Sequence, residues 1–505
     1  LFMFAACTLF LAACGRQTVK IMTPPDASNR VLFSAEQLQS TLDKAGYQVM
    51  MQQGDTTFSD PEIKTILLTE VNDTTLKKEG FHITTTGNLT RVSGRDGSGV
   101  IYGSRELIDR VNDSDGKLDF PEELKDGPEM VLRGACVGLQ KMTYLPGHGV
   151  YEYPYTPESF PWFYDKEQWI KYLDMLVANR MNSLYLWNGH PFASLVKLED
   201  YPFALEVDEE TFKKNEEMFS FLTEEADKRG IFVIQMFYNI ILSKPFAEHY
   251  GLKTQDRNRP ITPLIADYTR KSIAAFIEKY PNVGLLVCLG EAMCTVEDDV
   301  EWFTKTIIPG VKDGLQALGR TDEPPLLLRA HDTDCKLVMD AALPIYKNLY
   351  TMHKYNGESL TTYEPRGPWS KIHTDLSSLG SIHISNVHIL ANLEPFRWGS
   401  PDFVQKAVQA MHNVHGANAL HLYPQSSYWD WPYTADKLPN GEREFQLDRD
   451  WIWYQTWGRY AWNSHRDRAD EIGYWNHQLG QFYGTSDENA GNIRIAYEAV
   501  SYTHL

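Results

Sequence analysis

The chain has 505 residues, of which 43% are hydrophobic and 23% are charged, a composition that is ordinary for a globular protein with two or more domains. Its formal net charge is −19, and it contains no basic run. Because binding to nucleic acid or to an anionic lipid surface needs concentrated positive charge, this balance argues against both partners. A neutral or weakly charged substrate suits the chain better.

Residues 1–14 form a short apolar segment that ends in Leu-Ala-Ala-Cys. The segment is too short to span a bilayer and fits the apolar part of a secretory signal peptide. Its ending resembles a bacterial lipobox, in which the cysteine is lipidated and starts the mature chain. We therefore expect an exported lipoprotein of a bacterial envelope, in the periplasm or at the outer-membrane surface, that meets the membrane only through a lipid anchor at Cys14. The alternative is a plain signal peptide in which Cys14 has no role.

A small α/β domain is predicted for residues 18–125. Its strands are expected at 18–22, 47–51, 65–70, 81–87 and 88–94, and its helices at 33–46 and 102–111. Gly97, Gly99 and Gly103 lie at the entry to the second helix. A dinucleotide-binding fingerprint needs the third glycine one position earlier, so the spacing favours close packing of the helix over cofactor binding. We predict no cofactor.

From residue 131 the pattern changes to alternating strands and helices. The first helix is predicted at 165–182, with Asp165 and Gln168 forming a start that resembles a capping box. Eight apolar, strand-like segments lie at 131–139, 183–190, 231–240, 283–293, 325–334, 349–356, 382–394 and 417–424. Such continuous apolar runs indicate strands buried on both faces.

These segments predict a (β/α)8 TIM barrel over 131–485, with the chain ending close to the last barrel helix. A doubly wound open sheet is the alternative. We favour the barrel because polar and aromatic residues follow nearly every strand, whereas an open sheet gathers them at one switch point.

Glutamates follow three of the predicted strands, at the end of the barrel where catalytic groups lie. Glu291 follows the fourth strand, and apolar surroundings there should raise its pKa and suit it to be a general acid. Glu394 follows the seventh strand, and Glu364, after the sixth, is a third candidate. Two carboxylates that flank one glycosidic bond can hydrolyse it by acid/base chemistry. The alternative for each glutamate is a salt bridge or a helix cap.

Other residues after the strands are predicted to bind sugar. They are Trp187, Asn188 and His190 after the second strand, Arg329, His331 and Asp332 after the fifth, His353 and Lys354 at the end of the sixth, and Tyr428, Trp429 and Trp431 after the eighth. The aromatic rings can stack on sugars, and Arg329 or Lys354 can pair with a substrate carboxylate. Packing between loops and structural ion pairs are the alternatives. We predict no metal site, because no H-x-H pair follows the first strand and three or four ligands must converge.

Together these features resemble the xylan α-glucuronidases of glycoside hydrolase family 67 and their relatives, over most of the chain. The segments EGFHI and SGRDGSGVIYGSRELI are similar to the small α/β domain, shared with β-hexosaminidases, that precedes such barrels, and Leu132-Arg133-Gly134 is similar to the start of the barrel. The resemblance implies that Glu291 is the general acid and that Glu364 and Glu394 activate water. Such a mechanism would invert the configuration at the anomeric carbon of the sugar. In the family one of these two later carboxylates is an aspartate.

The sequence therefore predicts a glycoside hydrolase that cleaves a plant or host oligosaccharide or polysaccharide, with α-glucuronidase-like specificity as the finer expectation. Two alternatives stay open: a catalytically inactive carbohydrate-binding barrel of a glycan-uptake system, and a metal-dependent barrel hydrolase. Retention and inversion also stay open, because they depend on the distance between the two carboxylates.

Overall fold

The computed structural model of the chain describes residues 16–58, 60–139, 154–238, 241–290, 293–357, 360, 362–387, 399–424 and 432–502. The chain divides into two compact units, Leu1–Gly127 and Pro128–Leu505.

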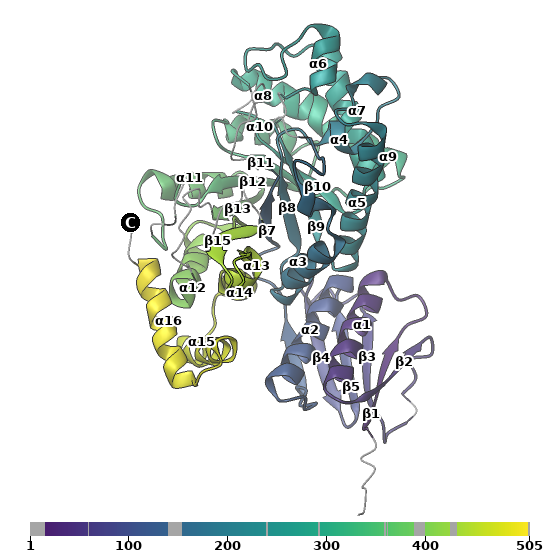
Figure 1. The fold of residues 1–505 in the computed structure, drawn as a ribbon, viewed down its shortest axis with the longest axis vertical. Helices are drawn as coiled ribbons and strands as arrows, with labels where there is room; N and C mark the ends of the chain where they lie inside the picture. Colours follow the sequence, from purple (N-terminus) through teal and green to yellow (C-terminus); the bar gives the residue numbers. More distant parts are fainter. Residues whose placement is uncertain are drawn as a thin grey trace, which may run out of the picture. The chain divides into compact units, whose positions relative to one another are not determined.

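The first unit is a small α/β domain built on a six-stranded sheet (Figure 1). Four strands run parallel in the order β2 (Gln48–Gln53), β1 (Thr18–Thr23), β3 (Lys64–Glu70) and β5 (Leu89–Gly94). Antiparallel pairing then adds β4 (Phe81–Thr86) and β6 (Glu123–Asp126). Helices α1 (Asn29–Lys44) and α2 (Gly97–Asp113) pack on each other and on the sheet.

The glycines at the start of α2 allow the helix to approach the sheet closely. The helix begins at Gly97, five residues before the predicted start, because the Asp96 carboxylate accepts a hydrogen bond from Gly99 N–H at 2.9 Å and caps it. A Cβ on Gly99 would lie 2.3 Å from the carbonyl oxygen of Gly80, and one on Gly103 would lie 2.5 Å from Val92 Cγ1. Protein atoms therefore fill the space beside these glycines.

The second unit contains the predicted closed barrel of eight parallel strands (Figure 1). The strands follow one another around the barrel in chain order, and the last pairs with the first. They are β7 (Leu132–Gly138), β8 (Ser183–Trp187), β9 (Phe232–Phe237), β10 (Val283–Val287), β11 (Leu326–Arg329), β12 (Leu349–Lys354), β13 (Ile382–Val387) and β14 (Ala417–Leu422). This confirms the predicted fold class, and each of the eight strands lies within one of the predicted segments.

Side chains fill the inside of the barrel, so it is a packed core and not a pore. Because successive residues of a strand point to opposite faces, alternate residues form the interior rows. In β12, for example, Tyr350 and Met352 belong to the buried interior cluster, together with Tyr185 and Trp187 of β8. The opposite rows pack against the surrounding helices.

The helices around the barrel start where the sequence provides caps. Asp165 accepts a hydrogen bond from Gln168 N–H at 3.0 Å, and Thr295 accepts one from Asp298 N–H at 3.1 Å. The longer helices are α3 (Lys166–Ala178), α5 (Glu209–Lys228), α7 (Pro263–Lys279), α8 (Val296–Trp302) with α9 (Ile308–Ala317), α10 (Cys335–Ala342), α11 (Pro368–Ser377), α12 (Pro401–Gln409) and α14 (Trp451–Trp462). The shorter elements are α4 (Phe192–Leu195), α6 (Lys244–Tyr250), α13 (Gln446–Arg449) and the hairpin of β15 (Tyr433–Lys437) and β16 (Arg443–Phe445).

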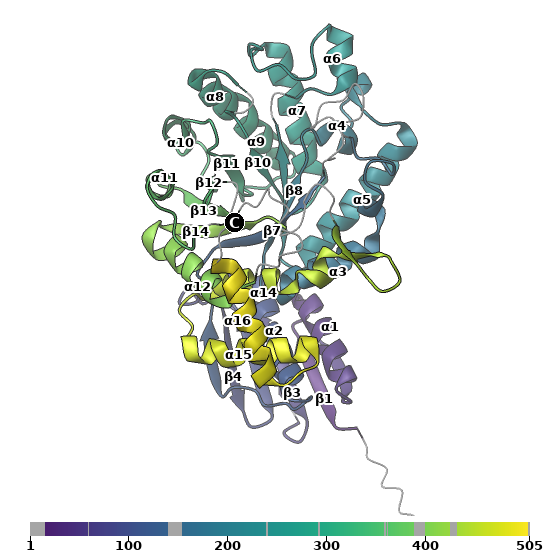
Figure 2. The same ribbon diagram turned by 60° about the vertical axis from the view of Figure 1, so that its left-hand side comes forward.

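Helix α14 covers the seam at which β14 meets β7. Met130 N–H, just before β7, donates to the carbonyl oxygen of Ala461 at 3.2 Å, and the Arg133 guanidinium lies 5.3 Å from the centroid of the Trp462 ring. Two further helices, α15 (Arg468–Tyr483) and α16 (Asp487–Tyr502), form a pair beyond α14 (Figure 2). The prediction that the chain ends close to the last barrel helix is therefore wrong.

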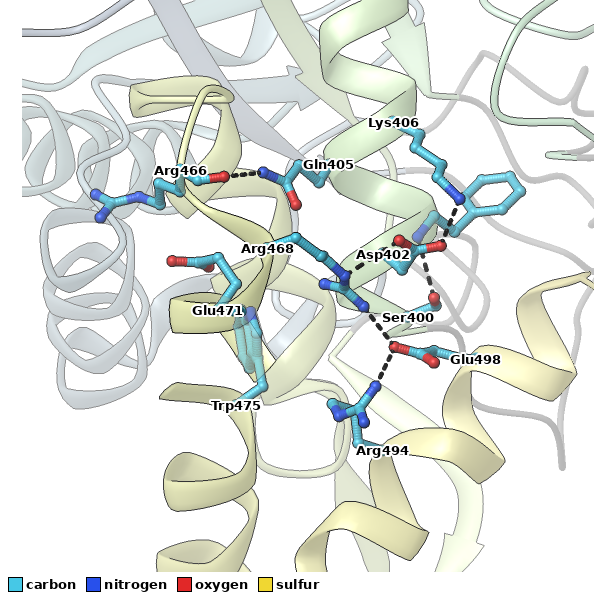
Figure 3. A network of polar contacts seen from close by, with 12 residues as sticks. Ser400, Asp402, Gln405, Lys406, Arg466, Arg468, Glu471, Trp475, Arg494 and Glu498 are labelled. Carbon is cyan, nitrogen blue, oxygen red and sulfur yellow. Dashed lines mark hydrogen bonds and ion pairs between the residues drawn. The ribbon is translucent and has the colours of Figure 1, made fainter. Parts of the chain in front are cut away.

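A network of ion pairs joins this pair of helices to α12 (Figure 3). Arg468 of α15 contacts Asp402 of α12 at 3.2 Å and Glu498 of α16 at 2.8 Å. Glu498 also pairs with Arg494 at 2.6 Å. Because three helices contribute to one network, α15 and α16 are part of the barrel unit rather than a loose extension.

Candidate functional site

The inward-facing residues at the carboxyl ends of the strands form the floor of the candidate site, and we call them the barrel-end layer. They are Trp187, Tyr238, Cys288, Arg329, Lys354, Asn386 and Tyr423. Trp187, Tyr238, Cys288 and Tyr423 belong to the buried interior cluster. Lys354 and Asn386 stand two residues beyond Met352 and Ile384 of the same cluster, so strand alternation points them inward as well.

Arg329 brings a positive charge into this layer and is held by its neighbours. Its guanidinium carbon lies 5.1 Å from the Trp187 ring centroid, and its Nη1 donates to Cys288 Sγ at 3.8 Å. Only 5% of Arg329 is exposed. The Trp187 ring meets Tyr238 and Tyr423 edge to face, at centroid distances of 6.4 and 5.6 Å. One fixed cation thus lies over the central ring of a group of three aromatic rings.

A second set of polar residues, one step earlier along the inward rows of the strands, supports this layer, and none of them was predicted as a site residue. His421 stacks on Tyr185 with ring centroids 3.9 Å apart, and its Nδ1 lies 3.0 Å from Met352 Sδ. Burial raises the pKa of Tyr185. The alternation of side chains along a strand could have predicted them. Tyr185 stands two residues before Trp187, and His421 stands two residues before Tyr423, so each pair points to the same face of its strand.

Asn188 and His190 are buried and shape the turn after β8. Asn188 Nδ2 donates to the carbonyl oxygen of Leu139 at 3.1 Å, and its Oδ1 accepts from His190 N–H at 2.9 Å. His190 Nδ1 lies 3.7 Å from a carboxylate oxygen of Glu206. These contacts connect the ends of β7 and β8, so both residues stabilise the rim beside Trp187.

His331 and Asp332 lie in an exposed turn after β11, and this turn packs on the end of β10. Gly290 N–H donates to Thr333 Oγ1 at 3.0 Å. A Cβ on Gly290 would lie 1.8 Å from the carbonyl oxygen of Asp332, so only glycine fits there. The two loops are therefore in direct contact one residue before position 291.

His353 faces the helices outside the barrel, whereas Lys354 belongs to the inward row. The His353 ring lies 5.5 Å from Trp369 and 5.9 Å from His373, both on α11, and its Nδ1 is 3.0 Å from the carbonyl oxygen of Lys354. Burial lowers the pKa of His353. Its position supports the end of β12 from behind, and the charges of His331 and Arg329, at the end of the neighbouring strand β11, also lower its pKa.

Glu364 is exposed, and its loop packs on the outer helices. The neighbouring Tyr363 ring meets Phe403 of α12 and Tyr502 of α16 at centroid distances of 6.2 and 6.5 Å. Tyr355 donates from its hydroxyl to the carbonyl oxygen of Tyr363 at 2.7 Å, and burial, then the charge of Glu364, raises the pKa of Tyr355. The described contacts thus place this loop against α12 and α16.

The other predicted site residues lie outside the described residues: Cys14, Glu291, Glu394, Tyr428, Trp429 and Trp431. Gly290 and Met293 are the described residues on either side of 291–292. Ser400 follows Glu394 in the chain, and its side chain accepts a hydrogen bond from Phe403 N–H at 3.1 Å and caps α12. Within the part of the chain that the structure describes, no group of three or more His, Cys, Asp or Glu residues is arranged to hold a metal ion.

The chain is similar to a solved GH138 enzyme that targets pectin rhamnogalacturonan II. The two share 73% sequence identity with a TM-score of 0.90, and the match covers 96% of this chain and 55% of the other. This chain therefore spans about half the length of that enzyme.

Other solved structures share the fold at much lower identity. The N-acetyl-β-hexosaminidase of Streptomyces plicatus matches with a TM-score of 0.55 and 12% identity, over 92% of this chain and 91% of that one. The chitobiase of Flavobacterium johnsoniae matches with a TM-score of 0.53 and 10% identity, over 96% and 70%. No protein-family profile matches the chain, and a search of curated proteins gives no match.

Proposed function

We propose that the chain forms the catalytic barrel of a glycoside hydrolase that acts on a pectic polysaccharide of the rhamnogalacturonan II type. The observation that carries this proposal is the 73% identity, over 96% of the chain, to a GH138 enzyme with that target. A barrel end with three aromatic rings and two cationic side chains suits the same function, because aromatic faces pack on sugars and cations bind their acidic groups.

In this proposal Glu291 is the general acid that gives its proton to the glycosidic oxygen. Glu394 either activates a water molecule or attacks the sugar carbon. Support comes from chain order, because Glu291 follows β10 by four residues and Glu394 lies between β13 and the capped start of α12. Glu364 is the weaker candidate, since its exposed loop packs on outer helices.

We further propose that the bound sugar carries a carboxylate. Arg329 and Lys354 bring two positive charges to the barrel-end layer of a chain whose net charge is −19. Such a concentration of positive charge favours an anionic group, and a planar guanidinium can bind a carboxylate with two hydrogen bonds. A uronic acid meets this requirement, and α-glucuronidase-like specificity is one form of it.

The test is hydrolysis of rhamnogalacturonan II oligosaccharides by the wild type and by Glu291→Gln and Glu394→Gln. We expect the wild type to release a sugar and each variant to lose roughly 10²–10⁴-fold in rate while still binding the oligosaccharide. Following the product by NMR distinguishes retention from inversion. Binding without hydrolysis by the wild type would favour an inactive carbohydrate-binding barrel, and loss of activity in a chelator would favour a metal-dependent hydrolase.

We also propose that the protein is exported and anchored through a lipid on Cys14. The apolar segment and its Leu-Ala-Ala-Cys ending support this. Among the described helices, none has both the length and the apolar character required to cross a bilayer. Labelled fatty acid should enter the wild type but not Cys14→Ser, and the variant should leave the membrane fraction. Equal labelling of both proteins would rule out this anchor.

A further inference from the structure

A tight turn in the connection between α6 and α7 presents two side chains to the end of β10. Arg259 N–H donates to the carbonyl oxygen of Asp256 at 3.2 Å, and Asn258 N–H donates to Asp256 Oδ1 at 3.0 Å. These bonds define a four-residue turn with Arg257 and Asn258 at its two central positions. We call Asp256–Arg259 the clamp turn.

The clamp turn contacts the segment after β10 at two points. Arg257 Nη2 donates to the carbonyl oxygen of Gly290 at 2.6 Å. Asn258 Oδ1 accepts from the thiol of Cys294 at 3.1 Å. In the chain, these two contacts stand on either side of position 291. The turn therefore holds the segment both before and after that position.

The end of β11 holds Gly290 from the other direction. Thr333 Oγ1 accepts from Gly290 N–H at 3.0 Å and donates to the carbonyl oxygen of His331 at 3.0 Å. The Asp332 carbonyl occupies the place where a Cβ of residue 290 would be. Both polar backbone groups of Gly290 are thus bonded to side chains of other loops, which leaves its two peptide planes little freedom to rotate.

One more hydrogen bond supports this arrangement, and one buried carboxyl interacts electrostatically with Arg257. Met293 N–H donates to the carbonyl oxygen of Leu289 at 3.0 Å, so the backbone is joined across the same segment. Asp299 on α8 is buried, with 3% of the residue exposed. Burial and Asp298 raise the pKa of Asp299 to about 7, and Arg257 is the positive charge that opposes this rise.

We propose that Arg257 is a positioning residue, which together with Thr333 fixes the Gly290 peptide, the backbone group that precedes position 291 in the chain. This rests on the proposed function, in which the next residue is the general acid. Arg257 binds backbone and not substrate in this role, so its loss acts on turnover rather than on affinity. A reacting group displaced by about 1 Å can lose roughly 10²-fold in rate.

The experiment compares Arg257→Gln and Arg257→Lys with Arg259→Gln, a control in the same turn whose guanidinium donates to the carbonyl oxygen of Lys253. Two quantities are measured: kcat and KM on rhamnogalacturonan II oligosaccharides, and amide hydrogen exchange of the segment 285–295. We expect Arg257→Gln to lower kcat about tenfold to hundredfold with KM almost unchanged and to speed the exchange. Arg257→Lys should recover part of both, because its ammonium group can donate to the same carbonyl. The control should change neither.

Thr333→Val provides a second variant, since it removes the acceptor of Gly290 N–H and should speed the same exchange. The proposal is overturned if Arg257→Gln keeps the wild-type kcat, or if Arg259→Gln loses as much. A wild type that cleaves no glycan defeats the proposed function instead. The hydrogen-exchange data then still test whether the clamp turn fixes the Gly290 peptide. If Arg257→Gln and Thr333→Val both exchange at the wild-type rate, the positioning role of Arg257 is overturned.

Discussion

His383 donates a hydrogen bond from Nε2–H to His373 Nδ1 at 2.8 Å, and the carbonyl group that His373 contacts fixes its direction. His373 Nε2 lies 3.1 Å from the carbonyl oxygen of Tyr355, which can only accept, so this nitrogen carries the proton and Nδ1 is the acceptor. His383 Nδ1 in turn accepts from the Thr351 hydroxyl at 3.0 Å. Both rings are neutral, and they link β12, β13 and α11.

We expect this pair to make the protein sensitive to acid. Burial lowers the pKa of His373 to about 3 and holds that of His383 well below its usual value. An unfolded histidine takes up a proton near pH 6.5 and the folded rings do not, so stability is lost as the pH falls below about 6.5. Each ring contributes about 1.4 kcal/mol per pH unit.

The measurement is the Tm of the wild type and of His373→Gln between pH 7.5 and 5. The glutamine amide can donate and accept at the same two places but does not titrate, so the variant should lose Tm less steeply on acidification. The same slope in both proteins would contradict this account.

Asp299→Asn is expected to stabilise the protein at alkaline pH. Burial raises the pKa of Asp299 to about 7, so between roughly pH 4 and 7 the folded state binds a proton that the unfolded state has released, and stability falls as the pH rises. Asparagine resembles the protonated acid and does not ionise. The Tm of the variant should exceed that of the wild type at pH 8 and match it at pH 4. If the Tm of Asp299→Asn at pH 8 were lower than that of the wild type, the folded state would favour the ionised form of Asp299 instead.

Arg329→Gln should weaken binding of acidic sugars much more than that of neutral ones. A hydrogen bond to a charged group contributes about 1.5–3 kcal/mol, which corresponds to roughly tenfold to 150-fold in Kd. Calorimetry with rhamnogalacturonan II oligosaccharides before and after chemical reduction of their carboxyl groups measures the difference. Arg320→Gln, at an exposed pair with Asp322, is the control. If the variant loses equal affinity for both ligands, Arg329 does not bind the carboxylate.

Glu471→Gln should destabilise the docking of α15. Glu471 is 2% exposed and accepts two hydrogen bonds from Arg459 of α14, at 2.7 and 2.6 Å, and one from Tyr460 at 3.0 Å. Burial alone would raise the pKa of Glu471, but the bonds from Arg459 outweigh it and lower the pKa. Breaking a buried pair leaves the other charge unpaired, which costs about 3–5 kcal/mol.

The readout is limited proteolysis of α15 and α16 together with Tm. The exposed Asp470, one residue away, supplies the control Asp470→Asn, for which we expect a change well below that of Glu471→Gln. Equal protection in the two variants would indicate that the pair with Arg459 does not hold the helix.

The strands of the barrel could be predicted because a strand that is buried on both faces consists of a nearly continuous run of apolar residues. The edge strand β6 (Glu123–Asp126) was missed because its residues, ELKD, are polar and partly exposed. Helix α2 was predicted five residues short, since its glycine-rich start has low helix propensity and forms through the Asp96 cap and close packing on the sheet.

The candidate site was predictable in part for a similar reason. Trp187, Arg329 and Lys354 were predicted from their place at strand ends, and parity along each strand then points them inward. His353 stands one residue out of phase with Met352 and Lys354, so the same parity already assigns it to the outer face. The contact of Arg257 could not be predicted from the sequence. Arg257 lies in a polar loop, and its partner, Gly290, is distant in the chain, so the pair becomes visible only in the folded structure.

The two strands that pair at the seam, β7 and β14, are the first and last strands of the barrel and lie far apart in the chain. During synthesis, β7 and β13 each keep an unpaired edge until residue 422 has been made, and α14, which covers the seam, is made later still. Open strand edges recruit other chains. A nascent chain of this protein is therefore most prone to aggregation shortly before the ribosome reaches the eighth strand, and a chaperone that shields β7 should raise the yield of soluble protein.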